Sequence, residues 1–131
     1  MKHILVVDDE SDIELLFNQK FRAEVRNGDY QFHYAFTGEE ALRYLRSLDP
    51  FDVAYVLTDI NMPGMSGLEL LGLIKADFPK LQVMVITAYG DKSNYEKTIS
   101  LGADDLLTKP VNFEVLKDKL RKNLSPGPSL N

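Results

Sequence analysis

Several side chains that could do chemistry occur just where apolar segments of the chain end. Asp8 and Asp9 follow the apolar run 3–7, and Asp59 closely follows the run 53–57, just before a proline and two glycines. Thr87 closes the run 82–87, and Lys109 comes two residues after the short run 105–107. Proline and glycine terminate strands, so we expect these groups at points where strands leave the core.

Together these residue types can bind a divalent cation and a phosphoryl group. Carboxylates about 4 Å apart repel each other by about 4 kcal/mol at an effective dielectric constant of about 20, so the cluster needs a cation. Oxygen ligands without Cys or His select a hard ion such as Mg²⁺, and the backbone carbonyl of Asn61 could add a ligand to Asp8 and Asp9. An aspartate can attack phosphorus when cations neutralise the incoming group, which makes Asp59 the candidate nucleophile, with Thr87 and Lys109 stabilising the phosphoryl oxygens.

Each residue also has an ordinary structural explanation. Asp59 alone could be a turn residue, and the acids after residue 7 could favour the dipole of a following helix. Lys109 alone could be a solvated lysine. Because these explanations would have to coincide at four strand ends, we favour one shared site.

The elements that must position these groups follow from the apolar pattern. Five apolar runs, at 3–7, 32–36, 53–57, 82–87 and 105–107, alternate with segments of helical periodicity, which predicts five strands and five helices. Three of the runs are almost continuously apolar, as in parallel strands covered on both faces. We therefore predict an α/β fold with a doubly wound parallel sheet, in which ligands bind at the carboxyl ends of the strands.

Helix starts carry a repeated signature. A Ser or Thr is followed three residues later by Glu at four expected starts: Ser11/Glu14, Thr37/Glu40, Ser66/Glu69 and Ser93/Glu96. The last helix, at about 113–124, is preceded by Asn112, another good cap.

Length and charge exclude several classes of protein. A chain of 131 residues without cysteine suits one domain and rules out a disulfide framework or a thiolate zinc site. The net charge of −5 argues against direct nucleic-acid binding. The first apolar run is too short for a signal peptide or a membrane span, so we expect a cytoplasmic protein without a membrane partner.

We expect the domain to cover 1–124, and 125–131 to be a tail or the start of a linker, in a stand-alone domain or a piece of a longer protein.

Four segments, VVDDE, LTDINMPGMSGLELL, VMVITAYGD and GADDLLTKP, resemble in order and spacing the receiver domain of two-component response regulators, the family that includes the chemotaxis response regulator. The resemblance covers about residues 2 to 124. It implies a flavodoxin-like sheet with strand order 2-1-3-4-5. It also implies that Asp59 takes a phosphoryl group from the phosphohistidine of a histidine kinase or phosphotransfer protein, with Mg²⁺ held by Asp8, Asp9, Asp59 and the Asn61 carbonyl.

The same resemblance implies a conformational switch. Thr87 and Lys109 would bind the phosphoryl oxygens, Ala88 and the loop behind it would reorder, and the Lys109–Pro110 bond is expected to be cis. The responding face would consist of the helix beginning near Ser93, the strand 105–107 and the helix 113–124. Through this face the domain would bind a second copy or an output domain.

Two positions bear on how the expected switch would work. Leu106 stands where the family commonly has an aromatic residue that swings inward, which puts transmission by that rotation in question. Tyr89, two residues past Thr87, could shield an acyl phosphate from water; an exposed loop tyrosine is the alternative.

Two other functions remain open on sequence grounds. A phosphohydrolase acting through an aspartyl phosphate needs an acid near the nucleophile, and in one large family it stands two residues later, where this chain has Asn61. We therefore expect no enzyme activity beyond the domain's own phosphorylation and dephosphorylation. A phosphorylation-independent, receiver-like interaction module is the second alternative, although such modules lose the acids, the threonine or the lysine that this chain keeps.

Overall fold

Five apolar segments form one parallel sheet in the computed structural model, which describes residues 2–47, 53–88 and 92–124. The strands are β1 (Lys2–Val7), β2 (Tyr30–Ala35), β3 (Tyr55–Asp59), β4 (Gln82–Thr87) and β5 (Asp105–Thr108). Their order is β2-β1-β3-β4-β5, and every neighbouring pair is parallel. The predicted doubly wound sheet and its strand order are confirmed, and the order reverses between β1 and β3, where such sheets bind ligands.

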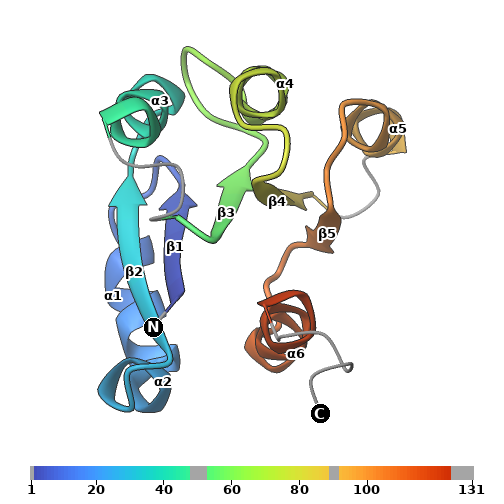
Figure 1. The fold of residues 1–131 in the computed structure, drawn as a ribbon. Coiled ribbons are helices and arrows are strands. Elements are labelled where there is room, and N and C mark those ends of the chain that lie inside the picture. Colours follow the sequence, from blue (N-terminus) through green and yellow to red (C-terminus); the bar gives the residue numbers. More distant parts are fainter. Residues whose placement is uncertain (1, 48–52, 89–91, 125–131) are drawn as a thin grey trace, which may run out of the picture.

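Helices cover both faces of this sheet, as continuous apolar strands require. The helices α3 (Gly38–Ser47), α4 (Gly67–Asp77) and α5 (Lys92–Ser100) lie along one face, and α1 (Ile13–Lys20), α2 (Arg22–Arg26) and α6 (Phe113–Leu124) lie along the other (Figure 1). Alternate side chains of β1 enter opposite halves of the core, Leu5 and Val7 on one side and Ile4 and Val6 on the other. None of the described helices combines the length and apolar character needed to cross a bilayer.

The prediction of five helices was wrong by one, because the first helical segment is interrupted at Phe21. The backbone of Phe21 has φ −108° and ψ 22°, outside helical geometry, so α1 ends before it and α2 begins after it. Hydrogen bonds of the helical type still join Phe21 to Phe17 and Val25 to Phe21. The Phe21 ring is fully buried and contacts Phe17 and Phe32. The helix is therefore interrupted at a residue whose side chain is fixed in the core.

The helix starts agree with the sequence at three of five places. Thr37 Oγ1 accepts the N–H of Glu40 at 3.0 Å, and Ser66 Oγ accepts the N–H of Glu69 at 3.2 Å. Asn112 Oδ1 accepts two N–H groups at the start of α6, at 3.0 and 3.2 Å. The cap predicted at Ser11 was wrong, since Asp12 precedes α1 without a side-chain capping bond; α5 begins at Lys92, ahead of the cap predicted at Ser93.

Candidate functional site

Three carboxylates converge at the carboxyl edge of the two central strands. Val7 pairs with Thr58, so Asp8, after β1, and Asp59, the last residue of β3, leave the sheet side by side. One oxygen from each of Asp8, Asp9 and Asp59 lies within 4.8 Å of the others. Asp8 and Asp59 are buried, with 7% and 3% of their surface exposed, whereas Asp9 is open to solvent.

The Asp59 carboxylate is held by two donors. Lys109 Nζ donates to Asp59 Oδ2 at 2.7 Å, and the backbone N–H of Asn61 donates to Oδ1 at 3.2 Å. The hydrogen bond to Asp59 raises the pKa of Lys109 above its usual range, although partial burial of the ammonium acts the other way. The bond therefore fixes a positive charge against the most buried of the three acids.

The charge of Asp8 is poorly compensated. Burial raises the pKa of Asp8, and the negative charges of Asp59 and Glu10 add to that effect. The N–H of Glu10, which donates to Asp8 Oδ1 at 3.0 Å, and the positive charge of Lys109 lower the pKa of Asp8 without cancelling the rise. One ammonium against three carboxylates leaves this edge of the sheet short of positive charge.

This deficit and the donor chemistry fit a hard divalent cation. Mg²⁺ takes oxygen ligands and keeps several waters, so a site with two buried carboxylates and one exposed carboxylate suits it. The N–H of Asn61 bonds to Asp59, which sets this residue beside the cluster. Its carbonyl as a further ligand stays a prediction.

The neighbouring strand ends bring part of the predicted switch to the same edge. Thr87 is buried at the end of β4, and its carbonyl accepts the N–H of Lys109 at 2.8 Å. Thr87 and Leu106 line a hollow of about 380 Å³ together with Tyr95 of α5. Ala88 is exposed, and Tyr89 lies outside the described residues.

A cleft of about 710 Å³ opens beside the acids. The Lys109–Pro110 bond on its border is cis, as predicted. The cleft is lined by charged residues and a proline, Asp8, Glu10, Lys20, Lys109 and Pro110, and by apolar side chains from α1, from β4 and from around the start of α6: Ile13, Leu16, Ile86, Val111 and Phe113. Charged and apolar groups therefore face the same space.

Gly67 helps to position Asp59, a role that was not predicted from the sequence. A Cβ atom built on Gly67 would lie 2.1 Å from the backbone oxygen of Asp59 and 2.7 Å from Ile60 Cα, closer than atoms can approach. The N–H of Gly67 instead donates to the Ile60 carbonyl at 2.8 Å. The start of α4 thus packs directly on the strand end that carries Asp59, and the only signal for it in the sequence is a glycine just after a helix cap.

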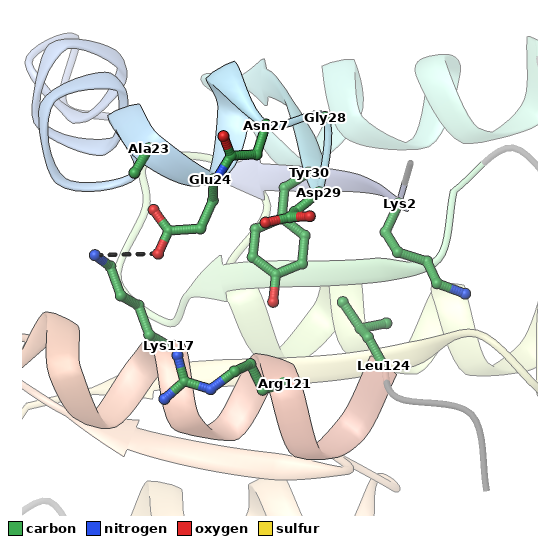
Figure 2. A pocket seen from close by; sticks show the side chains of 10 residues that line it. All are labelled: Lys2, Ala23, Glu24, Asn27, Gly28, Asp29, Tyr30, Lys117, Arg121 and Leu124. Carbon is green, nitrogen blue, oxygen red and sulfur yellow. Dashed lines mark ion pairs between the residues drawn. The ribbon is translucent and has the colours of Figure 1, made fainter. Parts of the chain in front are cut away.

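A separate pocket of about 530 Å³ lies at the other end of the sheet, between α2, α6 and the starts of β1 and β2 (Figure 2). An ion pair of 3.3 Å joins Lys117 to Glu24 across it, and Tyr30, whose pKa is raised by burial, projects between them and Leu124. None of the three clustered aspartates lines it. The acidic cluster and this pocket are therefore independent features.

Comparisons with known proteins agree with this geometry. The sequence model described as "Response regulator receiver domain" matches residues 4–121. The chain therefore belongs to the response regulator receiver domain family. Its sheet order, three clustered acids and cis Lys109–Pro110 bond are those expected from the sequence resemblance.

Individual relatives differ in how much of their length the chain covers. It is 33% identical to sporulation initiation phosphotransferase F of Bacillus subtilis, over 92% of this chain and 92% of that protein. It is 41% identical to a cyclic di-GMP phosphodiesterase of Thermotoga maritima, over 63% of this chain but only 21% of that larger protein. Among solved structures, the response regulator protein TrrA of Thermotoga maritima, in complex with Mg(2+)-BeF, is 36% identical, with a TM-score of 0.77 over 95% of this chain and 100% of that one.

Proposed function

We propose that the protein is a phosphoacceptor switch, in which Asp59 receives a phosphoryl group from a phosphohistidine of a histidine kinase or phosphotransfer protein. One observation carries the proposal: oxygens of Asp8, Asp9 and Asp59 gather within 4.8 Å of one another, and Lys109 Nζ lies 2.7 Å from Asp59. Membership of the receiver family adds support, because receiver domains are signalling modules and not classical enzymes.

The transfer exchanges one bond for another. A carboxylate oxygen of Asp59 forms the new O–P bond as the P–N bond of the phosphohistidine breaks, and the electron pair of that bond returns to the imidazole nitrogen. Lys109, now bonded to Asp59 Oδ2, shifts to an oxygen of the transferred group and offsets its charge. The hydroxyl of Thr87 would donate to another phosphoryl oxygen.

Asp8, Asp9, Asp59 and the Asn61 carbonyl would hold Mg²⁺ in this proposal. The ion would supply positive charge that offsets the charge of the acids and of the incoming phosphoryl oxygens. The Mg(2+)-BeF complex of the related TrrA protein supports this choice of metal.

The surface around the cleft suits a protein donor. Leu15 and Leu16 of α1 are 72% and 38% exposed, and Leu16, Val111 and Phe113 border the cleft that contains Asp8 and Lys109. A donor that packs on these apolar groups would present its phosphohistidine to Asp59. Partner binding would then change at the face formed by α5, β5 and α6 as Thr87 engages the phosphoryl group.

Beryllofluoride, which mimics a phosphoryl group on a carboxylate, tests the assembled site. We expect amide signals of Asn61, Thr87 and Lys109 to shift in NMR spectra of the wild type when beryllofluoride and Mg²⁺ are both present, and not with either alone. Asp59→Asn should abolish the shifts, whereas Asp29→Asn, at an exposed carboxylate near the other end of the sheet, should leave them intact. Equal shifts in wild type and Asp59→Asn would refute the assignment.

A further inference from the structure

A groove between α4 and α5 exposes apolar side chains that the proposed function does not use. Leu73 and Leu101 are each 39% exposed, and with Leu68 they line a groove of about 610 Å³. The two helices lie next to each other on one face of the sheet (Figure 1). This groove lies on the α4 side of α5, away from the face of α5, β5 and α6 assigned to the phosphorylation response.

Gly72 lines the groove without a side chain, although internal packing leaves room for one. It lies inside α4 with no positive φ, and a Cβ atom built on it would meet only Leu101 Cδ2, at an ordinary 3.9 Å. Glycine inside a helix is less favourable than alanine, so neither backbone geometry nor crowding explains this residue. Its effect is to leave a hollow beside the exposed Leu73.

The two charged side chains that line the groove have opposite signs. Glu69 comes from α4 and Lys97 from α5, and within the described residues neither forms an ion pair. The whole chain carries a net charge of −5, but these two charged groups of the groove cancel. Two negatively charged molecules could therefore approach each other here with little repulsion.

We propose that this groove binds a second copy of the same chain in a two-fold symmetric dimer. A two-fold interface places one patch against itself, so the patch must be complementary to itself. This one carries a partly exposed leucine, Leu73, beside the open space over Gly72, and one charge of each sign. In the dimer, Leu73 of each copy enters the hollow over Gly72 of the other, and Glu69 of each copy pairs with Lys97 of the other.

Charge reversal tests the pairing. Sedimentation velocity from about 10 μM to about 1 mM, where interfaces of small area dissociate, should show a monomer–dimer equilibrium for the wild type. Glu69→Lys and Lys97→Glu should each raise the dissociation constant at least about tenfold, because like charges then face each other. The double reversal should restore the wild-type value, and Arg26→Glu, at an exposed position on α2 across the sheet from the groove, should have no effect.

Filling the hollow gives a second, independent readout. Gly72→Gln should weaken dimer formation without lowering the melting temperature, since glutamine is a good helix former and extends into the groove. A protein that stays monomeric up to the highest concentration overturns the proposal, and so does a dimer that none of these substitutions weakens. The measurements need no magnesium or phosphodonor, and Asp59→Asn should dimerise like the wild type, so their failure is distinct from failure of the phosphoacceptor function.

Discussion

Asp8 illustrates the conflict between folding and function at the level of single residues. It is buried beside Asp59, and burial together with that neighbouring charge raises its pKa. Its ionised form is therefore a cost to the folded protein unless a cation occupies the cluster. This loss of folding free energy follows from holding ionised carboxylates close together at a metal site.

We predict that Asp8→Asn stabilises the protein without magnesium and loses this advantage with it. Asparagine keeps an oxygen acceptor for the N–H of Glu10 and removes the charge, so urea denaturation in EDTA should show a gain of about 1 kcal/mol. Magnesium at about 100 times its dissociation constant should stabilise the wild type by about 2.7 kcal/mol and the variant by much less. Asp29→Asn is the control; an unchanged order of stabilities in magnesium would argue against Asp8 as a ligand.

The same pair of proteins should show a defined pH dependence in EDTA. Because the pKa of Asp8 is raised in the folded state, the favourable contribution of its neutral form is complete below the ordinary value of 3.8 and is lost as pH rises through the raised pKa. The advantage of Asp8→Asn is therefore full above that raised pKa and shrinks as pH falls toward 3.8. A constant difference across this range would contradict the buried, ionised state assigned to Asp8.

At the level of elements, two helix starts with the same capping signature in the sequence differ in whether the capping hydrogen bond forms. Ser11 and Ser66 have the same spacing to a following glutamate, but only Ser66 accepts a capping hydrogen bond. We expect Ser66→Ala to cost about 1 kcal/mol of unfolding free energy. Ser11→Ala, an exposed matched substitution, should stay within about 0.5 kcal/mol of the wild type, and equal losses in thermal denaturation would show that the two caps do not differ.

Two glycines of α4 should respond in opposite directions to alanine. At Gly67 the new Cβ would overlap the Asp59 carbonyl, so we predict a loss of about 3 kcal/mol and a displaced Asp59. At Gly72 the new Cβ meets only an ordinary contact, so helix propensity should raise stability by about 1 kcal/mol. Chemical denaturation of both variants measures the difference, and a destabilised Gly72→Ala would mean that the hollow serves internal packing.

At the level of the whole molecule, the sequence predicted what depends on pattern. Nearly continuous apolar runs such as 82–87 predicted strands buried on both faces and hence a parallel sheet. The residues at the strand ends predicted the edge of the sheet at which Asp8 and Asp59 meet. The strand order came from resemblance to a family, because periodicity does not specify which strands are neighbours.

What the sequence missed depends on tertiary contacts. The break at Phe21 follows the burial of its ring among other aromatic side chains, and the failed cap at Ser11 reflects a helix that begins at Ile13. The requirement for glycine at Gly67 arises from a backbone contact between two elements that local pattern cannot reveal. These are features for which packing overrides local propensity.

Intact-mass analysis after incubation with acetyl phosphate tests the central claim most directly. With Mg²⁺ the wild type should gain the mass of one phosphoryl group, and peptide mapping should locate it on Asp59. Without Mg²⁺, or with Asp59→Asn, the mass should not change, while Asp29→Asn should label like the wild type. A wild type that stays unlabelled in Mg²⁺, or an Asp59→Asn protein that labels equally well, would contradict the account.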